Sequence, residues 1–504
     1  MSGLSWYNIA ICLIVSWGGY AYGFGFASFI TSQGQPSFYV YLNLDPTFCA
    51  CSILGACNAL FNFGLAIGSL FQGWLCDVVG RKKAFAVAGA CSLIGAALIT
   101  GSVTIEMLIV VRLLHGFGLG MLICLVPLYL TEVAPPKRRG LLSGLTTASF
   151  GAGYLFYRCA WVAVGTYHGK TFNVQVRLPW ALAMVGPAAL LLGLPFIPES
   201  PRYLVFKNRN PEAWKVLQRI HRDPHDADET MAHAEYTQIV RQIEKDKEVK
   251  AGYMEIFKNP SWRRRALLAI FIQFAAQSTG ILGIANYLVL IFTSLGTSGV
   301  MPLVVYAVYT TVGIICVLIA ISTVDKVGRR TMFLIGFPSL AVILLIEGIL
   351  QWQYLGTNNN PGLAGCVFVI FVYIVVFQTV DGPSFIWMAE IFPTNIRGRG
   401  IGLGFFSYFV GAITYSTPSN LAFKNIKYRM YFIYMGLCLI SVVIVYLYIP
   451  ETKQIPVEEI GALFGDEVAV HLTRDGHDIV EHDQGAQPDV KTSQQTDLMH
   501  AEKA

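Results

Sequence analysis

The sequence predicts an all-α membrane protein whose twelve transmembrane helices form two pseudo-symmetric six-helix bundles, and three observations support this. The 504 residues are 54% hydrophobic and only 13% charged, whereas soluble proteins carry about 25% charged residues. The apolar residues gather in runs of about 20, which is the length of helix that crosses a hydrocarbon core about 30 Å thick. Charged motifs between these runs recur half a chain later, which indicates an internal duplication.

Twelve apolar runs are predicted to span the membrane. Lipid offers no hydrogen-bond partners, so each run must satisfy its backbone amides internally, as a helix does. We predict an N-terminal bundle (1–197), a cytosolic linker with short helices (198–265), a C-terminal bundle (266–453) and a disordered cytosolic tail (454–504). The predicted spans are 9–30, 54–75, 84–101, 105–129, 142–164, 179–197, 266–293, 300–323, 332–352, 364–388, 400–422 and 431–449.

The first run is predicted to be a spanning helix rather than a cleaved signal peptide. It has no basic segment before it and no small-residue cleavage site after it. A predicted outer connection follows, with Cys49, Cys51 and Cys57 close together. Two of these cysteines can form a disulfide, and the sequence leaves the pairing open.

The distribution of basic residues predicts the topology. The connections 31–53 and 353–363 contain no Lys or Arg, whereas the opposite connections carry basic clusters that begin at Arg81, Lys137 and Lys326. Because cytoplasmic loops are enriched in Lys and Arg, both termini and the linker are predicted to face the cytoplasm. Basic residues near 170–177 and 424–429 argue against this assignment. We expect a multi-pass protein of the plasma membrane.

Three charged motifs recur about 250 residues apart. Such a duplication implies two six-helix halves related by an axis along the membrane normal, with a solute site between them near the midplane. The repeated pairs are Asp77-Val-Val-Gly-Arg81 with Asp325-Lys-Val-Gly-Arg329, Glu132-Val-Ala-Pro with Glu390-Ile-Phe-Pro, and Pro198-Glu199-Ser with Pro450-Glu451-Thr.

The same motifs place acidic residues beside basic clusters at the predicted cytosolic ends of helices. Ion pairs that form when this side is shut and break when it opens make a gate, and only a network of such pairs biases the equilibrium, because an exposed pair contributes about 0–1 kcal/mol. The alternative is that these charges only set the topology. The predicted gate residues are Arg81, Glu132, Arg138, Arg139, Glu199, Arg329, Arg330, Glu390, Arg397 and Glu451.

Five motifs, spread from the fourth predicted spanning helix to the residues just after the last, form a specific set. They are Arg112-Leu-Leu-His-Gly-Phe-Gly-Leu-Gly120, Pro127-Leu-Tyr-Leu-Thr-Glu132, Pro198-Glu-Ser-Pro-Arg202, Asp325 to Arg330, and Pro450-Glu-Thr-Lys453. As a set they resemble the sugar porter family of the major facilitator superfamily, with a fungal character. The resemblance implies movement of a sugar or polyol by alternating access, passively or with protons. It also implies that Arg112 lies at the cytosolic end of helix four and belongs to the gate.

The sugar contacts that the resemblance implies are only partly present. The fifth-helix position usually held by Gln is Thr147, and the seventh-helix pattern retains one Gln, Gln277, and its last Tyr, Tyr287. In the tenth helix the usual Trp is displaced, to Trp387. Each lost hydrogen bond is worth about 1 kcal/mol, so either other residues replace these bonds or the solute is not an ordinary hexose.

Replacements are available near these positions. Gln273 lies four residues before Gln277 and therefore shares its helix face, and Asn286 follows a glycine-rich break. The alternative role for these amides is helix–helix association. Aromatic side chains such as Phe385 and Tyr408 are further candidates to line a cavity. The predicted substrate-binding residues are Gln277, Gln273, Thr147, Asn286, Tyr287 and Trp387.

Proton-driven relatives usually carry an Asp in the first helix, where this sequence has Gly25, so proton coupling at that position is excluded. Two acidic residues remain within predicted spans. Asp381 precedes Gly382-Pro383, and a carboxylate inside a membrane is a functional candidate, so Asp381 is a candidate proton site. Glu347 is predicted to lie close enough to the outer surface to be solvated.

Three functions follow from these observations. The first is a uniporter or proton symporter for a sugar, polyol or related polyhydroxylated solute. The second is an exporter of an apolar metabolite or drug on the same fold, and the third is a non-transporting nutrient sensor. The sequence has no phosphate-binding loop or nucleophile elbow of an enzyme, and no cofactor, metal or nucleic-acid site is expected. The expected partners are the lipid bilayer, a small solute and protons, and the protein is expected to be monomeric.

Overall fold

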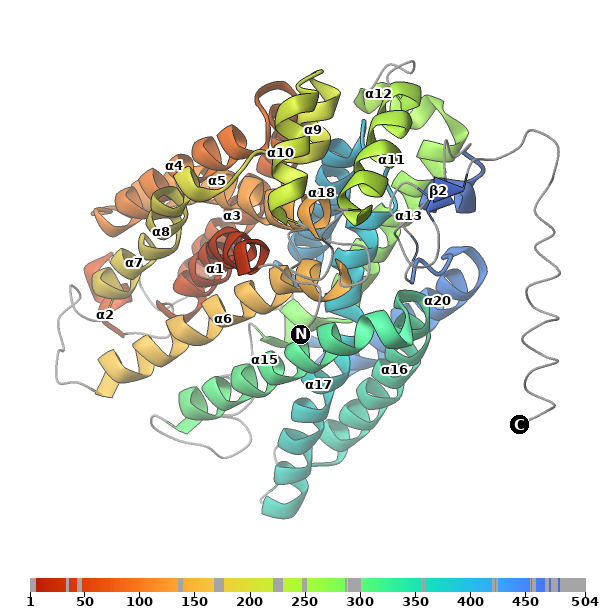
Figure 1. Ribbon diagram of the computed structural model, residues 1–504. Helices are drawn as coiled ribbons and strands as arrows, with labels where there is room; N and C mark the ends of the chain where they lie inside the picture. The colour runs from red at the N-terminus through yellow and green to blue at the C-terminus, as the bar shows by residue number, and fades with distance from the viewer. Residues whose placement is uncertain are drawn as a thin grey trace, which may run out of the picture.

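The structure is a computed structural model, and it shows two groups of long helices (Figure 1). It describes the chain except residues 1–5, 33–35, 43–47, 135–138, 167–175, 221–229, 247–251, 286–287, 289–300, 355–356, 358, 419–421, 423–424, 454, 456–458, 467–470, 473–478 and 481–504. The first group, coloured red to yellow, consists of α1 (Trp6–Ser32), α3 (Phe48–Val79), α4 (Arg81–Thr100), α5 (Ile105–Val133), α6 (Arg139–Thr166), and a sixth segment of α7 (Leu178–Leu182), α8 (Val185–Gly193) and η3 (Leu194–Phe196).

The second group, coloured green to blue, repeats the plan. It consists of α13 (Pro260–Ser278), α15 (Met301–Val327), α16 (Arg329–Tyr354), α17 (Asn360–Glu390), α18 (Arg397–Ser416) and α20 (Arg429–Tyr448). The backbone turns after α13 at Gly280, which has a φ of 87°, and helical residues resume at 281–285. A left-handed φ favours glycine, and a side chain there would also meet the ring of Tyr434.

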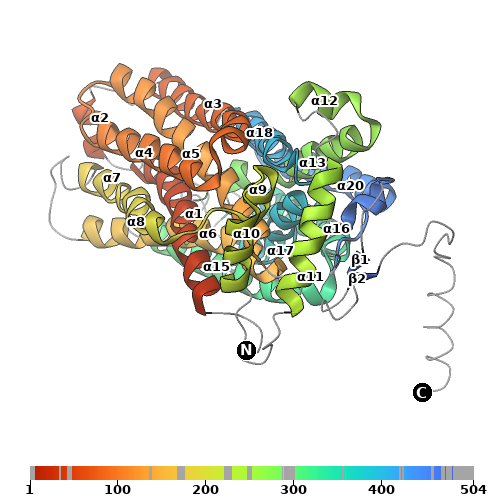
Figure 2. The ribbon, with the colours of Figure 1, turned by 45° about the horizontal axis from the view of Figure 1, so that its top comes forward.

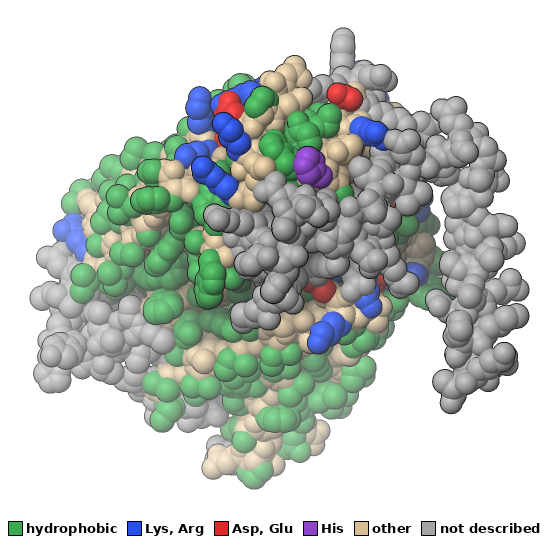
Figure 3. Space-filling view, in the orientation of Figure 1, with side chains coloured by type: hydrophobic (Ala, Val, Ile, Leu, Met, Phe, Trp, Pro, Cys, Tyr) green, Lys and Arg blue, Asp and Glu red, His purple; other side chains and the backbone are tan. Residues whose placement is uncertain are grey.

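Among the described residues, ten helical stretches are long and apolar enough to cross a membrane. The remaining two predicted spans correspond to α6 and α18, which are 28 and 20 residues long and contain more Gly, Ser and Thr. These two helices hold equivalent places in the two halves. The all-α fold of two six-helix halves is therefore as the sequence predicted. The flank visible in Figure 3 is largely apolar, which suits a protein surrounded by lipid.

Contacts between helices show the pseudo-symmetry of the halves. Within the first half α1 packs on α6, α3 on α5, and α4 on α5. Within the second half the equivalent pairs are α13 with α18, α15 with α17, and α16 with α17. The halves meet through two equivalent pairs, α3 with α18 and α6 with α15. This arrangement leaves α1, α6, α15 and α17 beside a shared central space.

Four short helices connect the halves and lie together at the top of Figure 1. They are α9 (Pro201–Phe206), α10 (Asn210–Ile220), α11 (Thr230–Asp246) and α12 (Tyr253–Lys258). Figure 2 shows α10 beside α11. The ends of α3 and α5 that carry the repeated acidic motifs contact α9, through Tyr203 with the carbonyl of Val78 and Arg202 with the carbonyl of Glu132. The equivalent ends of α15 and α17 lie on the same side of the molecule, because Asp325 binds the start of α6 and the segment after α17 leads to Arg397, which approaches Glu132. We call this side of the molecule the basic end.

Part of the predicted disordered tail has a defined structure. After α20 a 3-10 helix, η4 (Ile460–Phe464), packs against α13, and β1 (His471–Leu472) pairs antiparallel with β2 (Ile479–Val480). The buried Arg265 of α13 forms an ion pair with Asp466 and lies 4.8 Å above the ring of Phe464. These contacts order the segment because a buried cation needs a partner. The sequence pattern, which is polar overall, did not predict them.

Candidate functional site

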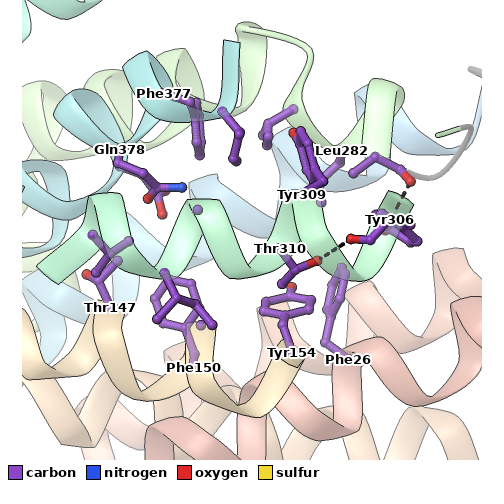
Figure 4. Close-up of a pocket in the computed structure, with 18 of the residues that line it drawn as sticks. Phe26, Thr147, Phe150, Tyr154, Leu282, Tyr306, Tyr309, Thr310, Phe377 and Gln378 are labelled. Carbon is purple, nitrogen blue, oxygen red and sulfur yellow. Dashed lines mark hydrogen bonds between the residues drawn. The ribbon is translucent and has the colours of Figure 1, made fainter. Parts of the chain in front are cut away.

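A cavity lies between the two halves, and its volume open to water-sized molecules is about 120 Å³. This is far more than one water needs and suits a small solute. The first half contributes residues of α1 and α6, and the second half contributes residues of α15, α17, α18 and the helical stretch after the break at Gly280. The lining is mostly aromatic and aliphatic (Figure 4). It comprises Phe26, Thr147, Phe150, Gly151, Tyr154, Ile281, Leu282, Ala285, Tyr306, Tyr309, Thr310, Gly313, Ile314, Val317, Ile374, Phe377, Gln378, Asp381 and Tyr408.

Polar side chains gather at one end of the cavity. Thr147 of α6 and Gln378 of α17 lie on the same side in Figure 4, and Asp381 follows one helical turn after Gln378. Thr147 Oγ1, Gln378 Oε1 and Asp381 Oδ1 are buried and have no hydrogen-bond partner among the described residues. A buried acceptor without a partner is costly. We call these three residues the polar end of the cavity.

The other end is formed by rings. Phe26, Tyr154, Tyr306 and Tyr309 lie away from the polar end in Figure 4, with Leu282 beside them. The hydroxyl of Tyr306 donates to the carbonyl of Ala285 at 3.1 Å, so this residue presents its ring rather than a free hydroxyl. We call this region the aromatic end. It differs from the hydrogen-bonding surface that an ordinary hexose requires.

The two glutamines predicted to bind substrate lie behind the cavity wall. Gln273 and Gln277 are fully buried on α13 and are not among the lining residues. Gln273 Nε2 lies 3.5 Å from Ser384 Oγ, and Gln277 lies beside the hydroxyl of Tyr408, which does line the cavity. Within the described part of the chain, the amide atoms of Gln277 have no hydrogen-bond partner. Gln277 therefore does not line the cavity in this conformation.

The other predicted contacts divide into three groups. Thr147 lines the cavity, as described above. Trp387 is fully buried away from it, and its indole donates to the carbonyl of Pro450 at 3.3 Å. Asn286 and Tyr287 lie outside the described residues. Of the two further aromatic candidates, Tyr408 lines the cavity and Phe385 packs just behind it, 5.7 Å from Phe150.

A side chain at the position of Gly25 would require the ends of two neighbouring side chains to shift. A Cβ there would lie 2.7 Å from Leu119 and 2.9 Å from His115. The neighbouring Arg112 lies seven residues after the start of α5, about 30 Å along that helix from Glu132. Its guanidinium is sandwiched between the rings of Phe29, at 3.7 Å, and Phe61, at 4.5 Å. The expectation that Arg112 belongs to the gate is therefore wrong, because the helix runs away from the basic end.

The first-half charge cluster at the basic end is built on Arg81 and Glu132. The Arg81 guanidinium donates to both oxygens of the Glu132 carboxylate, at 3.0 and 2.8 Å, and both side chains are buried. Arg397 of the second half approaches the same carboxylate at 4.0 Å. Arg202 donates to the backbone carbonyl of Glu132 at 2.6 Å. A buried carboxylate is thus surrounded by cations from both halves, which stabilises its charged form.

The second-half cluster repeats the core of this arrangement with different neighbours. Arg329 contacts Glu390 at 2.8 Å and Asp325 at 2.9 Å. The second oxygen of Glu390 accepts a hydrogen bond from Thr452 at 3.0 Å. These partners all belong to the second half. Among the described side chains, the Arg329 cation therefore has two carboxylates, whereas Glu390 has one cation and one hydroxyl.

Glu199 and Glu451 bind backbone amides rather than side-chain cations. Glu199 accepts from the amide of Arg81 at 2.9 Å, and Glu451 accepts from the amides of Arg329 and Arg330 at 2.9 and 3.0 Å. Each carboxylate thus caps the N-terminus of a helix, where negative charge is favoured. Burial raises the pKa of the Glu199 carboxyl, and the hydrogen bonds from backbone amides oppose this rise.

Positive-φ glycines make these caps possible. Gly80 and Gly328 have φ values of 93° and 104°, and a Cβ at either position would lie within 2.6 Å of the capping carboxylate. The recurring Asp-x-x-Gly-Arg motif thus encodes a helix end, a left-handed glycine and a new helix start. The motif fixes the same geometry twice.

Further contacts at the basic end cross between the halves. Asp325 of α15 accepts a hydrogen bond from the Leu141 amide near the start of α6, at 3.1 Å. The equivalent Asp77 of α3 lies 3.5 Å from Arg399 near the start of α18. Arg330, in contrast, donates to the carbonyl of Tyr446 in its own half. Arg138 and the side chain of Arg139, both predicted gate residues, lie outside the described residues.

Glu347 is buried rather than solvated. Its carboxylate accepts a hydrogen bond from Gln351 at 2.6 Å, and Gln351 also donates to the Tyr431 hydroxyl at 2.9 Å. The expectation of a solvated Glu347 is wrong because α20 packs over this face of α16. The cluster lies near the end of α16 opposite the basic end.

Sequence reasoning missed most of the cavity wall. Phe150 and Tyr154 are four residues apart on α6, and Tyr306 and Thr310 are four apart on α15, so each pair shares a helix face. In a spanning helix the same spacing is equally compatible with a face toward lipid. The helices that form the cavity had to be known before these faces could be assigned.

Comparison with known proteins agrees with this architecture. A family described as "Sugar (and other) transporter" matches residues 8–464. The "MFS-type transporter criB" of Aspergillus cristatus is 32% identical over 429 residues, which cover 83% of this chain and 86% of that protein. "Sugar transport protein MST3" of Oryza sativa subsp. japonica is 31% identical over 406 residues, which cover 78% of this chain and 75% of that protein.

Solved structures show the same fold. The proton:xylose symporter XylE of E. coli, bound to 6-bromo-6-deoxy-D-glucose, superimposes with a TM-score of 0.80 at 22% sequence identity. The match covers 91% of this chain and 99% of that one. The two six-helix halves and their central space are therefore a fold shared with that symporter.

Proposed function

Because this chain belongs to the sugar transporter family, a family of multi-pass membrane transporters, we propose that it carries a sugar, polyol or related polyhydroxylated solute through its central cavity by alternating access. One observation carries this proposal: the cavity lies between two duplicated halves whose charged clusters meet at the basic end. The halves close that end in this conformation. A rocking motion that separates the halves at the basic end opens the cavity to that side and closes it on the opposite side.

The gate consists of the contacts that cross between the halves. The cross-half partners of Glu132, Asp77 and Asp325 are Arg397, Arg399 and the amide of Leu141. Opening the basic end breaks all three at once. The pairs Arg81–Glu132 and Arg329–Glu390 stay within their halves and keep each half rigid while it moves.

The basic end faces the cytoplasm in this proposal, and the protein lies in the plasma membrane as a monomer. The support is the concentration of Lys and Arg on the connections at this end. The short helices α9 to α12 then lie on the cytoplasmic face. Glycosylation-site insertion at 43–47 and at 221–229 tests the topology, because only an outer site is modified.

Asp381 is the candidate proton site for a symport mode. Its carboxylate lines the cavity and its Oδ1 has no hydrogen-bond partner among the described residues, so a proton removes the cost of burying the charge. Gly25 provides no titratable group at the first-helix position. Uniport remains the alternative mode.

Uptake by cells that lack their own hexose carriers, measured over a panel of sugars and polyols at two pH values, tests the proposal. We expect saturable uptake of at least one polyhydroxylated solute. For a symporter, acid pH increases the uptake and Asp381→Asn removes the pH dependence. If pH leaves the flux unchanged, the symport mode is wrong and uniport stands. If no sugar or polyol is carried, the proposed substrate class is wrong.

The second candidate function is export of an apolar metabolite. The observation that favours it is the mostly aromatic and aliphatic lining of the cavity. Efflux of an apolar dye from the same cells, together with an absence of sugar uptake, would select this function.

A further inference from the structure

The two ends of the cavity bind different chemistry. The polar end offers buried oxygen atoms of Thr147, Gln378 and Asp381 that lack partners among the described residues. The aromatic end offers the rings of Phe26, Tyr154 and Tyr306. Thr147 and Tyr154 are both on α6, and seven residues of helix separate them by about 10 Å. The two ends are therefore far enough apart to bind two parts of one solute (Figure 4).

The polar end needs hydrogen-bond donors. The partnerless atoms of Gln378 and Asp381 are carbonyl and carboxylate oxygens, which accept. Hydroxyl groups of a solute donate to them and remove the cost of leaving buried acceptors unsatisfied. The two residues are one helical turn apart on α17, so neighbouring hydroxyls on a single ring reach both.

The aromatic end does not offer matching acceptors to the same extent. The Tyr306 hydroxyl is engaged with the Ala285 carbonyl, the Thr310 hydroxyl donates to the carbonyl of Tyr306, and Phe26 and Leu282 have no polar side-chain atom. The hydroxyls of Tyr154 and Tyr309 are the other polar side-chain atoms of this region, and each lies at the edge of a ring. When a free hexose binds at the polar end, the aromatic end stays filled with water, and contact between water and apolar side chains is unfavourable. An apolar group attached to the sugar fills it and removes apolar surface from water.

On the basis of the proposed function, we propose that the solute is amphipathic, with a polyhydroxylated head bound at the polar end and an aromatic substituent bound at the aromatic end. An aryl glycoside has this chemistry. The hydroxyl groups of the head donate to the oxygen atoms of the polar end, and the aromatic substituent packs against the rings of the aromatic end. The predicted glutamines, Gln273 and Gln277, lie outside the cavity wall and are not needed for this recognition.

The test compares matched ligand pairs on the full-length protein, purified in detergent and reconstituted in proteoliposomes. The pairs are glucose with phenyl β-D-glucoside and xylose with phenyl β-D-xyloside. We expect the aryl glycoside of at least one pair to bind about 10-fold to 100-fold more tightly than its parent sugar, because a phenyl ring leaves water. Counterflow of the labelled glycoside shows that the bound ligand is also carried.

Two variants on α6 provide a matched comparison. Tyr154→Ala removes a ring of the aromatic end, whereas Phe156→Ala removes a ring that is 60% exposed on the outer surface of the same helix. The first is expected to reduce the affinity ratio of aryl glycoside to parent sugar by about tenfold, and the second is expected to leave it unchanged. Tyr154→Leu, which keeps most of the volume but not the ring, is a second test if Tyr154→Ala folds poorly.

Each outcome decides the proposal. Equal affinities in both pairs, with sugar counterflow intact, overturn the amphipathic solute and leave the proposed function in place. Phenol that competes as strongly as the phenyl glycosides also overturns it, because the polar end then plays no part. If neither sugars nor glycosides bind or exchange with a well-folded preparation, the proposed function itself fails.

Discussion

The charge clusters of the two halves repeat the same motif but differ in the partners that reach them. In the first half, Glu132 accepts two hydrogen bonds from the Arg81 guanidinium and is also approached by Arg397 from the second half. In the second half, the partners of Glu390 among the described side chains are Arg329 and Thr452, both from its own half, and the side chain of Arg139, the equivalent of Arg397, is not among those described. Duplication thus preserved the contact within each half. The first-half carboxylate also carries a cation from across the interface, so we expect it to contribute more to closure of the basic end.

The largest effect is expected for Glu132→Gln. The change removes the anion from two buried cations, Arg81 and Arg397, and removing one partner of a buried ion pair costs about 3–5 kcal/mol. The midpoint temperature of thermal unfolding in detergent should fall, and amide hydrogen exchange at the basic end should accelerate. Glu106→Gln, an exposed position on the same helix, serves as the control and should behave as the wild type. A wild-type exchange pattern in Glu132→Gln would contradict the central role of this carboxylate.

Glu390→Gln should have a smaller effect. Arg329 keeps Asp325 at 2.9 Å, and the new amide still accepts a hydrogen bond from Thr452, so the loss should be about 1–3 kcal/mol. The two variants should be compared in one thermal unfolding series. If Glu390→Gln destabilises as much as Glu132→Gln, the cross-half cation Arg397 contributes nothing and the proposed difference between halves disappears.

Asp325→Asn sharpens the comparison between the two inter-half contacts. The carboxylate lies at the start of α6, where an anion stabilises a helix N-terminus by about 0.3–2 kcal/mol. Exchange at the Leu141 amide should accelerate in this variant. Asp77→Asn, which weakens the ion pair with Arg399 on the equivalent helix, should leave the Leu141 amide protected. If exchange at the Leu141 amide accelerates equally in both variants, the two inter-half contacts open together and do not stabilise their helix ends independently.

The smallest effects are expected where the halves are alike and exposed. Lys82 and Arg330 are equivalent residues that donate to backbone carbonyls, of Pro195 and Tyr446, in contact with solvent. Lys82→Ala and Arg330→Ala should each change unfolding free energy by less than about 0.5 kcal/mol. A large effect of either variant on thermal unfolding would show that exposed basic residues, rather than the buried clusters, stabilise the closed end.

The helices and their duplication followed from the sequence because both depend on local properties. Apolar runs of the right length must be helical in lipid, and the motif around Gly80 recurs around Gly328 with the same positive φ. The pairing of Arg81 with Glu132 agreed with the recurrence of acidic and basic residues. The expected position of Arg112 at the basic end was wrong. The motif match identified the helix that contains Arg112 but not the end of that helix at which it lies.

The cavity was harder to predict. Thr147, Asp381 and Tyr408 were identified from motif positions and from the cost of a charge in lipid, and they do line it. The rings of Phe150, Tyr154 and Tyr306 were not identified, since an aromatic residue in a spanning helix is compatible with lipid, with another helix or with a cavity.

The sequence by itself determined a membrane-embedded, duplicated twelve-helix protein, because hydropathy, helix length and repeated motifs are properties of segments. Only the tertiary structure decided which faces meet. The packing of α6 on α15 and of α3 on α18 brings Asp325 to Leu141 and Asp77 to Arg399. The same packing places an aromatic wall opposite Gln378 and Asp381. These neighbours are distant in sequence and are set by interhelical packing, for which hydropathy and helical periodicity contain no information.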